Sequence, residues 1–201
     1  VAAGVAPEAL GSGVRRGDLT QAGPADFSAR SELSFTGLHR SLPAVPRTYT
    51  LLIDVGNTFL KWGLFRPTAG GQAHDNRVET GHALHEEITA LPAQFAKLPT
   101  PGRIVISNVA GTRIRASVIR VLETWPDAPA PYWLVPQESQ CGVANSYRNP
   151  AQLGSDRWAA LIGARHLLGA RPAMVVVCGT ATTIDFLSAD GVFKGGMIMP
   201  G

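Results

Sequence analysis

Two short turns carry glycine and hydroxyl-bearing residues of the kind that bind phosphate. The first has the sequence DVGNT over residues 54–58, and the second has CGTATT over 178–183. Glycine lets a ligand approach the backbone, and successive N–H groups in one concavity form a nest for anions. In the first turn Asn57 and Thr58 add side-chain donors, and Lys61 adds a cation nearby. An ordinary hairpin tip is the alternative for either turn taken alone.

Together, the two turns predict a nucleotide held between them. Gly179 and Thr180 offer the same groups as the first turn, from the opposite side of a ligand. Asp54 ends the first strand and suits Mg²⁺, which keeps several waters and takes few carboxylates. The wide spacing of the turns is that of two copies of one half-domain with a ligand between them.

A third group, GSDR over residues 154–157, opens a predicted helix and offers an acid–base pair. Asp156 could accept the proton of a substrate hydroxyl during phosphoryl transfer. Arg157 could bind a substrate carboxylate through two N–H donors. Ser or Asp at a helix start is also a common N-cap, and an arginine beside it can simply face solvent. Asp185 could serve the same site or only cap a strand.

The remaining polar residues predict no metal centre. The five histidines lack metal-ligand spacing with cysteines or carboxylates, and His82 and His85 are expected on one face of a helix. Cys178 is expected in the core and Cys141 in a loop. The four tryptophans are expected to pack in the core rather than to form a stacking platform.

Strands and helices alternate along the chain in a way that predicts an α/β fold. Helices are expected over 82–98, interrupted or restarted at Pro92, over 113–125, and over 156–168, where Gly169 ends the helix. A polar loop is expected over 141–155. Apolar runs predict strands over 49–53, 59–65, 103–109, 132–135, 173–178, 184–187 and 192–199.

Composition excludes several classes of protein. Of 201 residues, 45% are hydrophobic and 16% charged, which suits a buried core and not a disordered chain. The net charge of +3 is too small to indicate a nucleic-acid platform, and no run of 18 apolar residues indicates a membrane span. Residues 1–47 are rich in Ala, Gly, Ser and Pro, and are expected to form a disordered or mis-started leader; a targeting peptide is the alternative.

From Tyr49 to Gly201 the chain resembles the type III pantothenate kinases, also called the Bvg accessory factor family. Any one of the shared motifs is weak, but four in this order are strong. They are DVGNTFLK over 54–61, NSYRNPAQLGSDR over 145–157, GTATTID over 179–185 and GGMIMPG over 195–201.

The resemblance implies two ribonuclease-H-like halves of the acetate-and-sugar-kinase/Hsp70/actin fold. The first lobe is expected over 48–155, and the start of the second over 156–201. The implied reaction transfers phosphate from ATP to pantothenate, in the cytoplasm, with Asp156 as the base. The implied pantothenate site is Tyr147, Gly154, Ser155, Asp156 and Arg157. The implied ATP contacts are Asp54, Val55, Gly56, Asn57, Thr58, Phe59, Leu60, Lys61 and Thr180.

Two departures from the family pattern qualify these expectations. Many members carry Asp at the position of Val177, where it binds K⁺ or NH₄⁺; a valine side chain cannot. Members also continue past the Pro–Gly pair, so we expect a fragment of a homodimeric enzyme, poorly stable alone because an apolar sheet face would be uncovered. The alternatives are a regulatory accessory protein that binds nucleotide without turnover, and a kinase of another hydroxylated acid.

Overall fold

The computed structural model describes residues 49–66 and 76–201 of the chain. These residues all belong to one compact unit, residues 44–201. The leader expected over 1–47 lies outside the described residues. Within them the fold is α/β, as expected, and is built on two five-stranded sheets.

The first sheet has the strand order β3-β2-β1-β4-β5. The first three strands are antiparallel hairpin neighbours, whereas β4 and β5 run parallel to β1, which is the ribonuclease-H-like arrangement expected. Leu51, Ile53 and Val55 of β1 are buried on one face, as the two-residue period of a strand requires. The strands are β1 (Thr50–Val55), β2 (Phe59–Phe65), β3 (Arg77–Leu84), β4 (Arg103–Asn108) and β5 (Tyr132–Trp133).

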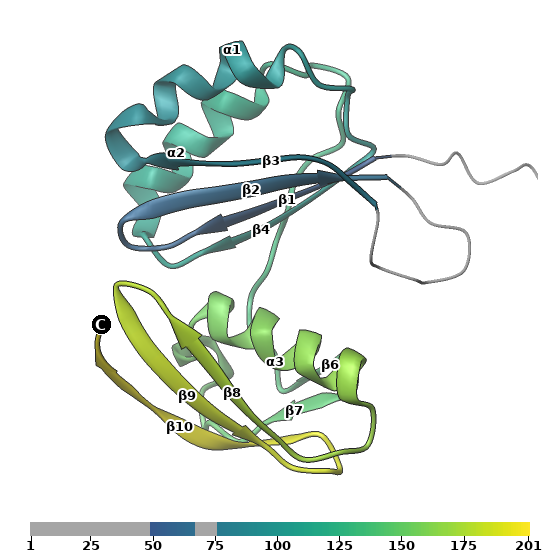
Figure 1. Ribbon diagram of the computed structural model, residues 1–201, viewed down its shortest axis with the longest axis vertical. Coiled ribbons are helices and arrows are strands. Elements are labelled where there is room, and N and C mark those ends of the chain that lie inside the picture. Colours follow the sequence, from purple (N-terminus) through teal and green to yellow (C-terminus); the bar gives the residue numbers. More distant parts are fainter. Residues whose placement is uncertain (1–48, 67–75) are drawn as a thin grey trace, which may run out of the picture. The chain divides into compact units, whose positions relative to one another are not determined.

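Helical segments cover one face of this sheet (Figure 1). They are η1 (His85–Ala90), α1 (Leu91–Phe95) and α2 (Gly111–Leu122). Three aromatic side chains fill the interface: Phe95 meets Trp62 edge-on and stacks on Trp125, each at 5.0 Å between ring centroids. Because aromatic rings bury large apolar areas, this cluster holds the sheet and the helices together.

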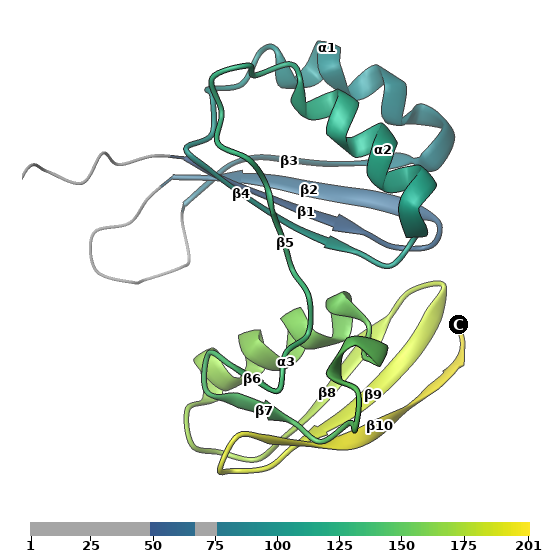
Figure 2. The same cartoon turned by 180° about the vertical axis from the view of Figure 1, so that it is seen from behind.

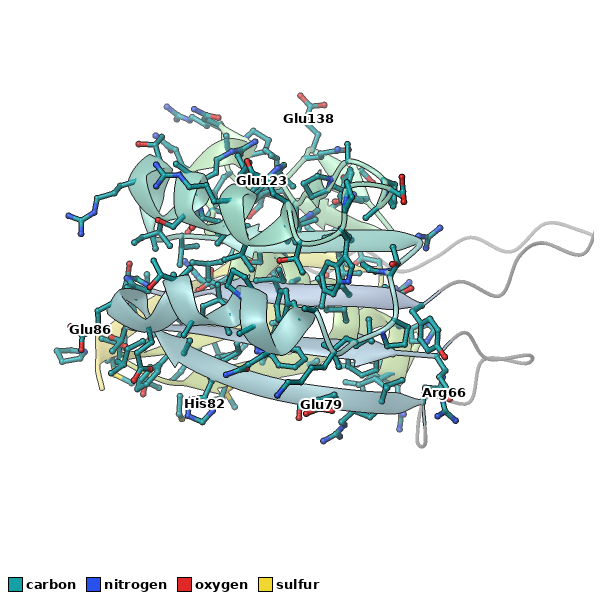
Figure 3. The ribbon with its side chains drawn as sticks, turned by 90° about the horizontal axis from the view of Figure 1, so that it is seen from above. Arg66, Glu79, His82, Glu86, Glu123 and Glu138 are labelled. Carbon is teal, nitrogen blue, oxygen red and sulfur yellow. The ribbon has the colours of Figure 1, made fainter. Side chains whose placement is uncertain are left out.

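The helix predicted over 82–98 is wrong in its first turn. Residues up to Leu84 belong to β3, where His82 pairs with Lys61 of β2. This strand lies at the sheet edge, and Glu79 and His82 project outward from it, as Figure 3 shows. An edge strand lined by polar residues lacks the apolar alternation that would have revealed it.

The second sheet has the order β6-β7-β10-β9-β8, and its last three strands are antiparallel hairpin neighbours like β1 to β3. Helix α3 (Ser155–Leu168) lies against one face (Figure 2), where Trp158 and Leu161 pack with Phe193. The strands are β6 (Ser139–Gln140), β7 (Val143–Asn145), β8 (Ala173–Cys178), β9 (Ala181–Leu187) and β10 (Val192–Pro200), with η2 (Pro150–Gln152) before α3.

Two sequence-based boundaries shift in this sheet. Strand β7 falls in the segment expected to be a loop over 141–155, and β6 and β7 place residues 139–145 in the second sheet although they lie in the range 48–155. Strand β9 also starts at Ala181, so the second turn is shorter than its CGTATT sequence suggested. Strands β6 and β7 are short and contain polar residues, so they show no two-residue apolar period that would have revealed them.

Candidate active site

A pocket of about 340 Å³ is lined by both predicted phosphate turns and by the start of α3. Side chains from the two sheets therefore meet at one place, as the sequence predicted. The lining residues are Asp54, Gly56, Asn57, Thr58, Phe59, Lys61, Val109, Asp156, Arg157, Val177, Cys178, Gly179, Thr180, Ala181 and Thr183.

The first turn joins β1 to β2 and is fixed from two directions. Within the turn, the Gly56 N–H donates to the Phe59 carbonyl at 3.0 Å. From outside, Nε2 of His85 lies 2.9 Å from the Gly56 carbonyl oxygen, and because a carbonyl only accepts, this nitrogen carries the proton. Val55 and Leu60, two of the expected ATP contacts, are buried in the core and do not line the pocket.

The second turn lies against the first through a hydroxyl contact. Oγ1 of Thr180 is 2.8 Å from Oγ1 of Thr58, which is within hydrogen-bond distance. The Gly179 N–H donates to the Ala181 carbonyl at 3.1 Å and closes the turn. Two hydroxyl groups from distant parts of the sequence thus face the same pocket beside two glycines.

Asp54 places a carboxyl group in this pocket, at the end of β1 and opposite Lys61 on β2. Its side chain still reaches solvent in the pocket, so its desolvation is partial. Partial burial and then the nearby Asp156 carboxylate raise the pKa of Asp54, while a hydrogen bond from Ser107 and the charge of Lys61 oppose the rise. A carboxyl group whose charged form is disfavoured in this way is suited to a bound cation.

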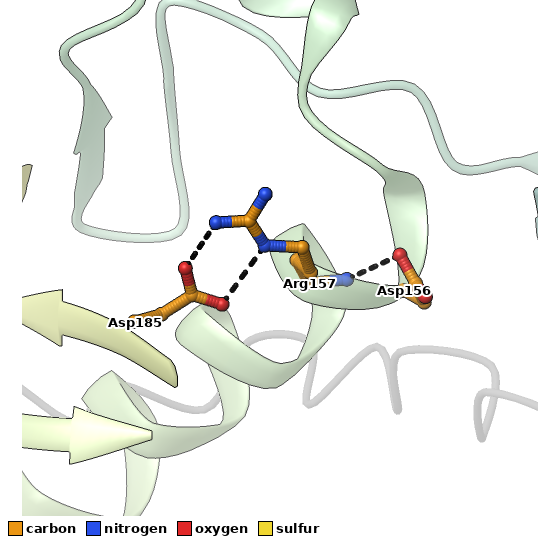
Figure 4. Close-up of polar contacts among 3 residues, drawn as sticks. All are labelled: Asp156, Arg157 and Asp185. Carbon is orange, nitrogen blue, oxygen red and sulfur yellow. Dashed lines mark hydrogen bonds and ion pairs between the residues drawn. The ribbon is translucent and has the colours of Figure 1, made fainter. Parts of the chain in front are cut away.

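The start of α3 is fastened to β4 by serine side chains. Gly154 is the N-cap residue, and Oγ of Ser155 accepts from the Asn108 N–H at 3.1 Å and lies 3.0 Å from Oγ of Ser107. Oδ1 of Asp156 accepts from the Arg157 N–H at 2.7 Å (Figure 4). Because Ser155 is fixed to β4, the next residue, Asp156, is held with its carboxylate at the pocket.

Arg157 differs from the free anion clamp that the sequence suggested as one of two interpretations. Its guanidinium forms a two-pronged ion pair with Asp185: Nε donates to Oδ2 at 3.0 Å, and Nη2 to Oδ1 (Figure 4). Arg157 and Asp185 are only 7% and 1% exposed. The hydrogen bond with Asp185 is the largest cause of a raised pKa at Arg157, and Tyr147 adds a smaller contribution.

Three expected pantothenate contacts do not line this pocket. Tyr147 packs with Phe193 at 5.5 Å between ring centroids, next to the Arg157–Asp185 pair. Gly154 and Ser155 form the start of α3 instead.

Two residues of the site could not be assigned from the sequence. Sequence reasoning missed His85, because nothing in a lone histidine 29 residues from the turn signals a contact. It left Asp185 undecided because the partner of a buried charge is visible only in the fold.

Two general features of the described residues complete the site. Among residues 49–66 and 76–201, no group of three His, Cys, Asp or Glu side chains could hold a metal ion by itself. A cation here would therefore need oxygen atoms from a ligand or water in addition to Asp54. No helix in the same described ranges is long and apolar enough to cross a membrane.

The fold and the pocket define a two-sheet α/β protein with opposed phosphate-type turns beside a carboxylate at a helix start. A family model described as type III pantothenate kinase matches residues 50–201. The chain belongs to the type III pantothenate kinase family.

Curated relatives carry the same name but are longer than the matched region. The type III pantothenate kinase of Aromatoleum aromaticum is 47% identical over 151 residues, which are 75% of this chain and 58% of the relative. That of Methylibium petroleiphilum is 46% identical over 160 residues, or 75% of this chain and 60% of the relative. The chain thus spans less than two thirds of the length of these relatives.

Solved structures give a weaker likeness. The Ppx/GppA family member of Aquifex aeolicus has a TM-score of 0.43 and 14% identity, over 76% of this chain and 51% of that one. The ethanolamine utilization protein EutJ of Carboxydothermus hydrogenoformans has a TM-score of 0.41 and 11% identity, over 78% and 53%. Likeness at this level carries no functional inference.

Proposed function

We propose that the protein containing this chain phosphorylates pantothenate with ATP, giving 4′-phosphopantothenate and ADP in the first step of coenzyme A biosynthesis. The supporting observation is a single pocket that holds both phosphate-type turns, a helix-start carboxylate and an arginine. Phosphoryl transfer depends mainly on positioning and on electrostatic stabilisation, and this set of groups supplies both.

Each group has a role in this proposal. The backbone and hydroxyl groups of the two turns bind the ATP phosphates, with Lys61 as a nearby cation. Asp54 would hold Mg²⁺, which supplies charge neutralisation for the phosphates when bound. Asp156 accepts the proton of the 4′-hydroxyl as that oxygen attacks the γ-phosphorus, and ADP leaves. The raised pKa of Asp54 fits a carboxyl group that needs a cation partner.

Val177 stands where many family members carry the Asp that binds a monovalent cation, and its side chain has no oxygen. Val177 pairs across β8 and β9 with Thr183, and Oγ1 of Thr183 is buried without a hydrogen-bond partner among the described residues. We propose that K⁺ or NH₄⁺ is not held by the side chain of residue 177.

We also propose that the full-length protein is a homodimer, as the family resemblance implies. Light scattering on the full-length protein measures its mass in solution and tests this proposal.

Replacing Asp156 by Asn tests the proposed base, because the amide keeps the shape but cannot accept the proton. We expect kcat to fall about 10²–10⁴-fold with a similar KM for ATP, the range for loss of general base catalysis. ADP release is measured on the full-length protein with pantothenate and Mg²⁺, and calorimetry measures nucleotide binding. If Asp156→Asn turned over as fast as wild type, the proposed mechanism would be wrong. If the wild-type protein bound nucleotide but did not phosphorylate pantothenate, the accessory-protein alternative would be favoured.

A further inference from the structure

The ion pair between Arg157 and Asp185 leaves only part of the guanidinium free for a ligand. A guanidinium has five N–H donors, and Asp185 takes the one on Nε and one on Nη2. Three donors remain. One on Nη1 and one on Nη2 form the end-on edge of the group, while the second Nη1 donor points back toward the side chain, and a side-chain hydrogen bond with Tyr147 also contributes to the raised pKa of Arg157. In Figure 4 no bond from Nη1 to the other residues drawn is marked.

The surroundings prevent the pair from rotating. The Phe193 ring lies 5.8 Å from the Arg157 guanidinium, and Asp185 comes from the middle of β9. On the neighbouring strand, a Cβ atom at Gly196 would lie 2.9 Å from Nη2 of Arg157 and would also collide with Asp185. Glycine at this position therefore makes room for the pair, and the orientation of the guanidinium is fixed by the sheet.

We propose that Asp185 is a positioning residue for substrate binding: it occupies the side edge of Arg157 and turns the end-on edge to a carboxylate in the pocket. This inference rests on the proposed function and adds to it the way in which the acid is recognised. Arg157 lines the pocket while Asp185 does not, which is the arrangement of a contact residue supported from behind. The two N–H groups of the end-on edge match the two oxygens of a carboxylate.

Replacing Asp185 by Asn separates positioning from simple electrostatics, because the two explanations predict opposite signs. Asn offers one acceptor and directs an N–H₂ group at an arginine donor, so the guanidinium loses its fixed orientation. We expect the KM for pantothenate to rise about ten-fold or more, as for loss of a hydrogen bond between charged groups, with the KM for ATP unchanged. If only charge mattered, removal of a negative group would lower the KM for pantothenate.

An uncharged substrate isolates the carboxylate contact. With the primary amide of pantothenate in place of the acid, wild type and Asp185→Asn should show the same KM. Asp190→Asn is the matched control, because it also removes one carboxylate from the same sheet but lies exposed in the β9–β10 turn, where Ser188 is its partner. It should leave both KM values unchanged.

Thermal melting of each variant monitors folding. Should Asp185→Asn fail to fold, Asp185→Glu keeps the charge and moves the carboxylate, so a raised KM for pantothenate still supports positioning. An unchanged or lowered KM for pantothenate in a folded Asp185 variant overturns the inference, and so does an equal rise with the uncharged amide. Wild-type protein that does not turn over pantothenate overturns the proposed function instead.

Discussion

At the scale of single residues, the charged form of Asp54 lowers the stability of the ligand-free protein but is the form that a bound cation needs. Partial burial and the charge of Asp156 raise its pKa above the ordinary value of 3.8, so the folded protein disfavours the charged form. The cost is present above the raised pKa and is relieved as the pH falls through it. A Mg²⁺ ion acts in the opposite direction, because it favours the carboxylate.

Asp54→Asn should therefore raise the melting temperature of the ligand-free protein at pH 7. The difference from wild type should shrink as the pH approaches 3.8, because the wild-type carboxyl group is then neutral as well. The variant should also lose most of the stabilisation that Mg²⁺ and ATP give to wild type. Differential scanning calorimetry at several pH values measures both effects.

Asp190 supplies the control of opposite sign. A hydrogen bond from Ser188 lowers the pKa of Asp190, so its charged form stabilises the fold at neutral pH. Asp190→Asn should thus lower the melting temperature where Asp54→Asn raises it. A shift of the melting temperature in the same direction for both variants would show that the environments of the two carboxyl groups do not have opposite effects on their charged forms.

At the scale of elements, the first phosphate turn depends on a contact from outside its own hairpin. His85 begins η1 directly after β3, and its ring reaches the Gly56 carbonyl. The Leu84 N–H donates to Oε2 of Glu87 at 2.9 Å, which fixes the backbone next to His85. The β3–η1 junction therefore holds the turn that we assign to the ATP phosphates.

His85→Ala should raise the KM for ATP about five-fold, the effect of losing about 1 kcal/mol of hydrogen bonding. The KM for pantothenate should stay the same, because the second sheet and α3 are untouched. His85→Gln should recover part of the loss, since its amide can also donate to the carbonyl. His166→Ala is the control, because it removes an exposed imidazole from the last turn of α3 that does not line the pocket. Equal KM values for ATP in all variants would remove His85 from this role.

Local signals explain which elements the sequence could predict. Strands β1, β2, β4 and β8 are apolar runs next to polar turns, and α3 ends at Gly169, so each has its own signal. The edge strand β3 and the short β6 and β7 depend on pairing with distant strands, which no window reveals. The site divides in the same way. Turn residues and Asp156 stand out by type and spacing, whereas the partners of Arg157 and Gly56 are set by tertiary contacts.

At the scale of the whole described region, the two sheets differ in how their faces are covered. In the second sheet, α3 packs against the face that carries Asp185 and Leu187. The opposite face is apolar and exposed, and no helix of the described residues lies on it (Figure 2). Met174 pairs with Phe186 across β8 and β9, and the exposed side chains of this face include Met174 60%, Val176 51%, Phe186 47% and Met197 52%.

Because contiguous apolar patches of this kind bind other apolar surfaces, the chain of 201 residues should bind the dye ANS and associate at high concentration. Replacing Met174 and Phe186 together by Thr should lower both effects, since Thr suits a strand but removes the apolar surface. Lys194→Thr, an exposed change in the same sheet, should leave dye binding as it is. Dye fluorescence and light scattering at several concentrations measure the outcome. Wild-type chain that binds no dye, or a double variant that binds as much as wild type, would show that this face is covered in solution.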